Sequence, residues 1–117
     1  MLHIRGNEIF LSDAAGFRRR IIDEGGGPVR SYAFSAGAIE DSPEHCHADS
    51  IELFVAVEGE GSVVVDGVEV PLSRSDVLIV EPGEYHFVRR NGPKPLHVLA
   101  VVTPNLDDTK FKSDSKD

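Results

Sequence analysis

The chain has no tryptophan, one cysteine and one methionine among its 117 residues. A single cysteine excludes an intrachain disulfide framework, so we expect a reducing, cytoplasmic location. No apolar run approaches the ~20 residues of a membrane-spanning helix. The first residues also lack the apolar stretch of a signal peptide. We therefore expect a soluble protein that has no membrane partner and is not exported.

Basic residues are scarce as well. Twelve Lys and Arg stand against 20 Asp and Glu, which gives a formal net charge of −8. Because proteins bind nucleic acids mainly through clustered Lys and Arg, this balance argues against a nucleic-acid partner. The acids concentrate in residues 40–84, where Arg74 is the one base. We expect most of them to lie in turns, where they favour solubility and attract cations mildly.

No part of the sequence sustains the 3.6-residue period of an amphipathic helix. Short apolar stretches of strand length recur instead, separated by turn residues. Asp66-Gly67 is typical of a type I′ hairpin turn. The predicted strands are Glu8–Leu11, Phe17–Ile22, Val29–Ile39, Ile51–Val57, Ser62–Val65, Val68–Leu72, Val77–Val80, Tyr85–Arg90 and Leu96–Val102. This pattern predicts a single-domain, all-β sandwich or barrel with at most a short helical turn, at residues 12–16.

The chain divides into three predicted parts. Residues 1–28 form an N-terminal strand or arm, residues 29–103 a barrel, and residues 104–117 a polar C-terminal tail. The arm contains three consecutive arginines, Arg18–Arg20. They fit a solvated edge strand, since charges protect a sheet edge from pairing with other chains. An anion site is the alternative.

Histidines carry the chemistry of this sequence. His45 and His47 are two residues apart, so on a strand their imidazoles point to the same face. A bend through residues 48–50 would bring Glu52 back to the same point, and His86 begins a later strand. Imidazole nitrogens with one carboxylate form a mixed ligand set for a divalent first-row metal. The alternative is a group of hydrogen-bonded histidines without a metal.

These residues stand in two motifs that resemble those of the cupins. The first is His45-x-His47-x4-Glu52-x6-Gly59, preceded by Gly37, and the second is Asp76-x4-Glu81-Pro82-Gly83-x2-His86, followed by Asn91. The resemblance covers residues 29–103. Some spacings depart from the family pattern: seven residues instead of five separate Gly37 from His45, Ser75 replaces a glycine, Pro82 directly precedes Gly83, and Asn91 comes one residue late. All of these are loop positions, and the four ligand types are intact.

The resemblance implies a small jelly-roll barrel with a metal ion inside its mouth. It implies His45, His47, Glu52 and His86 as the metal ligands, which leaves two positions of an octahedral ion for water, substrate or O₂. Fe²⁺ is the first expectation for the metal, and Mn²⁺, Ni²⁺, Zn²⁺ and Cu²⁺ accept the same ligands. The family also implies a small-molecule partner and a homodimer.

Three further residues are candidates for contact with a substrate. His97 would serve as an acid or base, Tyr32 as a hydrogen-bond donor, and Arg90 lies on the His86 face of its strand. The alternatives are a hydrogen-bonded bystander for His97 and a satisfied buried hydroxyl for Tyr32. By alternation, Cys46 points away from the metal.

The expected function is that of a metal-dependent enzyme acting on a small molecule. An Fe(II) dioxygenase-like oxidoreductase is the first interpretation. An isomerase or lyase on the same scaffold is one alternative. A non-catalytic cupin that binds a sugar or metabolite is the other, because a fold does not settle a function.

Overall fold

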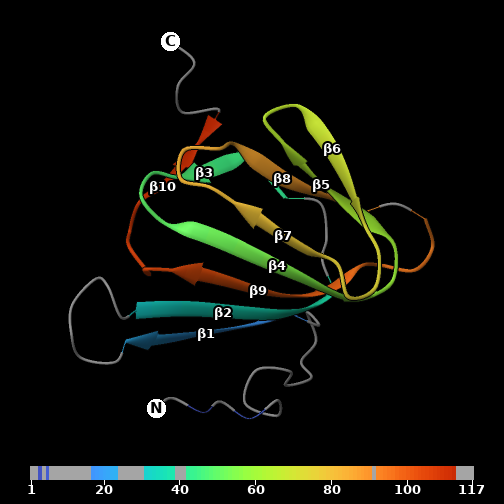
Figure 1. Cartoon of the computed structure of the whole chain (residues 1–117), viewed down its shortest axis with the longest axis horizontal. Helices are drawn as coiled ribbons and strands as arrows, with labels where there is room; N and C mark the ends of the chain where they lie inside the picture. Colours follow the sequence, from blue (N-terminus) through green and yellow to red (C-terminus); the bar gives the residue numbers. More distant parts are fainter. Residues whose placement is uncertain are drawn as a thin grey trace.

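The computed structural model describes residues 17–23, 31–38, 42–90 and 92–112, together with His3 and Arg5. Within these residues the chain forms ten β-strands and no α-helix, so none that could cross a membrane. The strands build two antiparallel sheets that face each other as a jelly roll (Figure 1). The all-β prediction is confirmed.

Each sheet has five strands. Sheet A has the order β1 (Phe17–Asp23), β2 (Ser31–Ala38), β9 (His97–Thr103), β4 (Ile51–Glu58) and β7 (Val77–Val80). Sheet B has the order β10 (Thr109–Phe111), β3 (His45–His47), β8 (His86–Arg90), β5 (Gly61–Val65) and β6 (Val68–Leu72). Apart from β1–β2 and β5–β6, the paired strands are not consecutive in the chain, so both sheets are held together mainly by long-range pairing.

The core lies between the two sheets because apolar residues alternate along the facing strands. On β4, Phe54 and Ala56 are 3% and 2% exposed, and Glu52 continues the same inward row. The register pairs Phe54 with Ala100, and Glu52 with Val102. Phe54 therefore belongs to the apolar core, and Glu52, two residues earlier on the same face of β4, belongs to a layer of polar side chains beside it. The candidate site is built on this layer.

The hairpin between β5 and β6 matches its prediction. Asp66 and Gly67 have φ angles of 46° and 82°, the positive values that a type I′ turn requires at both central positions. Within the described part of the chain β1 is the end strand of sheet A, which agrees with the edge-strand prediction for Phe17–Ile22. The alternative anion site rests on arginine side chains that lie outside the described residues, as do the predicted strand Glu8–Leu11 and the predicted turn at residues 12–16.

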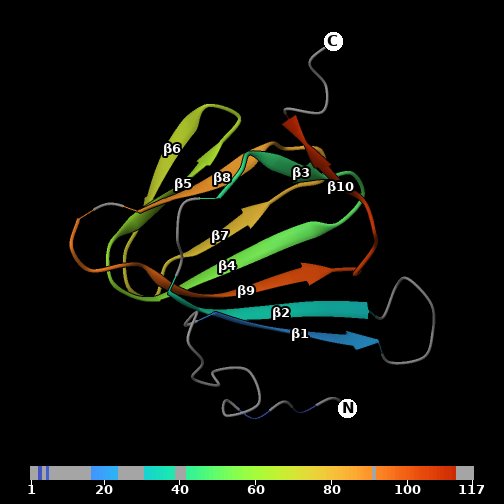
Figure 2. The same cartoon turned by 180° about the vertical axis from the view of Figure 1, so that it is seen from behind.

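Two strands of the structure, β3 and β10, are absent from the predicted strand ranges. Thr109–Phe111, in the segment expected to be a polar tail, forms β10 and pairs antiparallel with β3. Both views of the fold show β10 alongside β3 (Figure 1, Figure 2). Hydrogen bonds extend this pairing at both ends, from the Ala48 amide to the Asp108 carbonyl at 3.1 Å and from the Lys112 amide to the Glu44 carbonyl at 3.0 Å. The short strand β3 is therefore held between two neighbours.

Candidate metal centre

Two facing sheets supply the four predicted ligands. His45 and His47 are the ends of β3, and His86 begins β8, where it pairs directly with His45. Glu52 comes from β4 in the opposite sheet. One potential ligand atom from each of the four residues lies within 4.8 Å of the other three. The structure thus brings together the full set that the sequence predicted, and the set is able to hold a metal ion.

Glu52 is the centre of this cluster. Its Oε1 lies 3.2 Å from Nε2 of His47 and 2.9 Å from Nε2 of His86. The side chains of His47, Glu52 and His86 are 11%, 12% and 1% exposed. The ring of His45 completes the group, with its centroid 4.4 Å from that of His86. Phe54, one step deeper on β4, stacks edge-on against His86 at 6.2 Å and forms an apolar floor.

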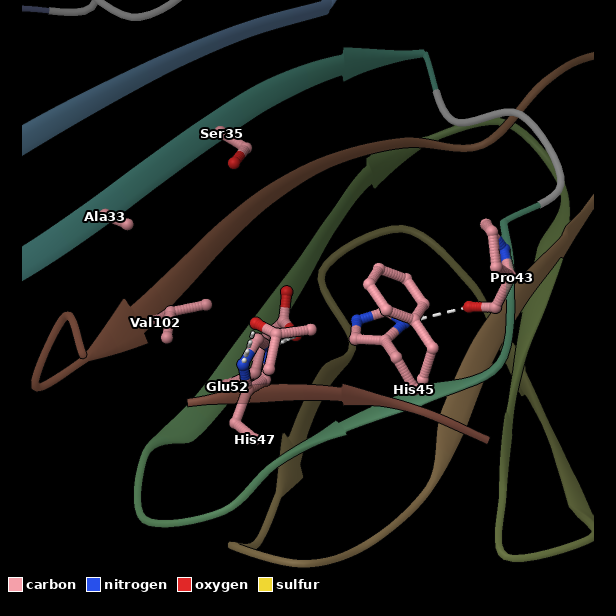
Figure 3. Close-up of a pocket in the computed structure, with 9 residues that line it drawn as sticks. Ala33, Ser35, Pro43, His45, His47, Glu52 and Val102 are labelled. Atoms are coloured by element: carbon pink, nitrogen blue, oxygen red, sulfur yellow. Dashed lines mark hydrogen bonds and ion pairs between the residues drawn. The ribbon is translucent and has the colours of Figure 1, made fainter. Parts of the chain in front are cut away.

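The hydrogen bonds behind the rings determine which nitrogen faces the centre. Nδ1 of His45 lies 2.8 Å from the Pro43 carbonyl, and Nδ1 of His86 lies 3.0 Å from the Glu84 carbonyl. Figure 3 marks the contact between His45 and Pro43 with a dashed line. A carbonyl only accepts hydrogen bonds, so both rings carry their proton on Nδ1 and keep Nε2 for the centre. Such outward hydrogen bonds are typical of metal-binding histidines. The residues therefore fit a divalent transition metal.

The electrostatics of the cluster favour an ionised Glu52. Burial alone would raise the pKa of its carboxyl, but hydrogen bonds with His47 and His86 outweigh burial and lower the pKa to about 2. Burial lowers the pKa of His45. Burial also disfavours the charged form of His86, but the hydrogen bonds to Glu52 and to the Glu84 carbonyl, together with the negative charges of these two glutamates, outweigh burial and raise the pKa. Near neutral pH Glu52 is therefore a carboxylate anion.

These shifts predict how the metal-free protein responds to pH. The pKa of Glu52 is about 2 in the fold against 4.5 as the reference, so its stabilisation is complete above pH 4.5 and is lost as the pH falls towards 2. The loss is on the order of 3 kcal/mol. Urea unfolding of chelator-treated protein between pH 6 and 2 measures it. A Glu52→Gln variant should show a shallower acid dependence, and an equally steep one would contradict the assignment.

The cluster opens into a cavity of about 390 Å³. The cavity is lined by Ala33, Ser35, Pro43, His45, His47, Glu52, Val102, Thr109 and Phe111. Figure 3 shows Ala33, Ser35 and Val102 on the sheet A side of this space, across from His45. The lining therefore combines apolar walls with the hydroxyls of Ser35 and Thr109, and the four-residue cluster lies at its edge.

The remaining candidates lie elsewhere. Ala33 and Ser35 line the cavity, so Tyr32 is on the other face of β2, where its ring lies 6.0 Å from that of Phe34. Val98 and Ala100 point into the core, which puts His97 on the outer face of β9. The structure does not bring either of these two residues to the cavity. The side chain of Arg90 lies outside the described part of the structure.

The sequence predicted the orientation of Cys46, but it did not predict the position of Asp108 beside the cluster. Cys46 is buried on the opposite face of β3 from the two histidines, as alternation predicted. Asp108 was missed. It precedes β10, and its Oδ1 lies 3.7 Å from Nδ1 of His47. No spacing rule connects Asp108 with His47, because only the unpredicted pairing of β10 with β3 brings them together.

Comparisons with known proteins agree with this geometry. The family profile described as "Cupin domain" matches residues 33–102. An oxalate-binding protein of Thermotoga maritima is 33% identical over 58 residues, which are 50% of this chain and 48% of that protein. The chain spans about half the length of the curated relatives that it matches.

Solved structures share the fold at low identity. A conserved double-stranded β-helix protein from Klebsiella pneumoniae superposes with a TM-score of 0.69 and 18% identity, covering 93% of this chain and 95% of that one. Streptomyces PAC13 with uridine has a TM-score of 0.64 and 16% identity, over 86% and 80% of the two chains. These structures confirm the jelly roll, and the matched profile confirms the resemblance of the two motifs. The chain belongs to the cupin family.

Proposed function

We propose that this protein is a metal-dependent enzyme in which His45, His47, Glu52 and His86 hold a divalent transition metal, first of all Fe²⁺, for the oxidation of a small organic molecule. One observation carries the proposal. Three imidazoles and one carboxylate converge at the edge of a cavity of about 390 Å³. The ionisable groups among the residues that line this cavity all belong to the cluster itself. Groups that could take part in acid–base or metal chemistry therefore lie only at the metal position of this cavity.

A dioxygenase-like reaction suits this distribution. When bound, the metal supplies open positions for substrate oxygens and O₂, together with the redox chemistry. Both atoms of O₂ enter the organic product, so the reaction needs no further co-reactant. The anionic Glu52 offsets part of the charge of the metal. Burial of the cluster excludes most of the surrounding water and strengthens electrostatic interactions.

The cavity also indicates the class of substrate. Its volume is within the range of pockets that hold small organic ligands. Ala33, Val102 and Phe111 would contact the hydrocarbon part, and the hydroxyls of Ser35 and Thr109 would hydrogen-bond to polar groups. The oxalate named for the Thermotoga relative and the uridine in the PAC13 structure are both small and rich in oxygen. They support a small substrate that is rich in oxygen.

A non-catalytic metabolite-binding cupin is the second candidate. The observation in its favour is that a curated relative carries the description of an oxalate-binding protein. Such a protein would use the same four residues to hold a metal and a ligand. It would release that ligand unchanged.

One experiment separates the two functions. The protein is purified anaerobically, its metal content is measured, and oxygen uptake is followed with catechols, thiols and diketones. One metal per chain with substrate-dependent oxygen uptake is the result expected for the enzyme. Stoichiometric metal with saturable binding of such compounds and no turnover would support the metabolite-binding alternative. A protein that binds no divalent metal would refute both.

A homodimer and a cytoplasmic location stay predictions. Strand β1 ends sheet A among the described residues, so its outer edge is the position where a second copy would add a strand. A hydrodynamic mass of twice 12.7 kDa would support the dimer, and a mass near 12.7 kDa would refute it.

A further inference from the structure

Asp108 lies behind His47, on the side of the ring away from Glu52. The two nitrogens of the imidazole have different carboxylate neighbours: Nε2 is 3.2 Å from Glu52 Oε1, and Nδ1 is 3.7 Å from Asp108 Oδ1. The Asp108 side chain is 10% exposed. A buried carboxylate in this place needs an explanation, because a charge away from water is costly unless it has partners.

One oxygen of Asp108 has several partners. Its Oδ2 accepts hydrogen bonds from the amides of Asp49 and Ser50 at 2.8 and 3.0 Å, and the Ser50 hydroxyl lies 3.0 Å away. These amides form the bend that follows His47 and precedes Glu52. Asp108 thereby holds the bend that returns the chain from β3 in sheet B to β4 in sheet A.

The other oxygen has none. Oδ1 of Asp108 is buried and lacks a hydrogen-bond partner within the described part of the chain. Nδ1 of His47 lies 3.7 Å from it, at an ion-pair distance rather than a hydrogen-bonding one. Hydrogen bonds in ligand sites are often long without the ligand and shorten once it is bound. An unpaired acceptor beside the outward nitrogen of a ligand histidine is the arrangement that supports metal binding.

We propose that Asp108 is a positioning residue of the metal centre. Its Oδ2 fixes the bend between His47 and Glu52, and its Oδ1 accepts the Nδ1 proton of His47, which leaves Nε2 for the metal. His45 and His86 receive the same support from the carbonyls of Pro43 and Glu84. Asp108 provides for His47 what backbone carbonyls provide for the other two rings. The inference rests on the proposed metal-dependent function.

Thr109 is the competing acceptor. Its hydroxyl oxygen lies 3.2 Å from Nδ1 of His47 and either donates or accepts there. An Asp108→Asn variant distinguishes the two residues. Its single oxygen is needed by the Asp49 and Ser50 amides, so its NH₂ group is presented to His47. An NH₂ group cannot accept the Nδ1 proton, and the ring is pushed towards the tautomer with its proton on Nε2, so that this nitrogen no longer has a lone pair for the metal.

Zn²⁺ alone is the probe for the test. Its affinity is measured by competition with a chromophoric chelator in the unmodified protein and in Asp108→Asn, Thr109→Val and Asp107→Asn. Asp107 is the matched control, because it loses the same charge from an exposed neighbouring position. We expect Asp108→Asn to bind Zn²⁺ about 10–100-fold more weakly. Thr109→Val should lose less, and Asp107→Asn should bind as the unmodified protein does.

Nitrogen-15 NMR of the Zn²⁺-loaded protein gives a second measurement. The Nδ1 proton of His47 should be present and protected from exchange, and it should lose this protection in Asp108→Asn. A rapidly exchanging Nδ1 proton in the unmodified protein would overturn the inference, as would normal Zn²⁺ affinity in Asp108→Asn. A larger loss in Thr109→Val would overturn it in favour of Thr109. Failure of the unmodified protein to bind Zn²⁺ would instead overturn the proposed function, and this inference with it.

Discussion

Replacing His47 by alanine is expected to reduce metal affinity by more than the ~10–100-fold seen when a supporting residue is lost. The change removes one of the four converging side chains. It also deprives Glu52 of one of its two histidine contacts. Metal content after gel filtration, and Zn²⁺ affinity by chelator competition, measure the effect. The fold should persist, because His47 lies in the polar layer beyond the apolar core.

His97→Ala is the matched control for this prediction. It removes the same side chain from a strand of the same barrel, but from the outer face of β9. We expect its metal content to equal that of the unmodified protein. Equal metal in His47→Ala would contradict the centre assigned here. A comparable loss in His97→Ala would show that the measurement reports on the general integrity of the barrel.

Replacing Gly59 by alanine should have the largest effect on stability. Gly59 has a φ of +93°, and a Cβ there would lie 2.7 Å from the Pro95 carbonyl carbon and closer still to its oxygen. The backbone cannot easily withdraw, because the Glu60 amide donates to the Lys94 carbonyl at 3.0 Å. Strain and overlap act together, so we expect a loss of more than about 4 kcal/mol in the free energy of unfolding.

Gly67→Ala separates the two causes. Gly67 has a similar φ of +82°, but a Cβ there would meet nothing within 4 Å. This variant carries the backbone strain alone, about 1–2 kcal/mol. Urea unfolding of both variants gives the difference. Equal losses would mean that the close approach of residues 94–96 to Gly59 contributes nothing to the stability of the barrel.

Local rules account for much of what the sequence could predict. Two-residue alternation places His45 and His47 on one face with Cys46 on the other, and this rule needs no knowledge of the partner strands. The turn at Asp66-Gly67 is equally local, because positive φ at both positions selects these residue types. The bend through residues 48–50 was predicted as the link to Glu52, and the structure confirms it.

Non-local pairing accounts for what was missed. Strand β10 is three residues long and all three residues are exposed, so it has no hydrophobic period to reveal it. Asp108 depends on that pairing for its place behind His47. The location of His97 has a similar cause. Alternation groups His97 with Leu99 and Val101, but which face of β9 points inward depends on the strands that pair with it and on sheet B opposite.

The position of β3 between β8 and β10 has a consequence for the order in which the protein is made. His45 and His47 leave the ribosome before His86, and His86 leaves before Thr109–Phe111. Until Phe111 has emerged, β3 lacks one of its two neighbouring strands. Contacts between such distant parts of a chain form late in folding. The complete cluster thus belongs to the folded barrel, and a metal ion that needs all four residues is acquired after their synthesis rather than during it.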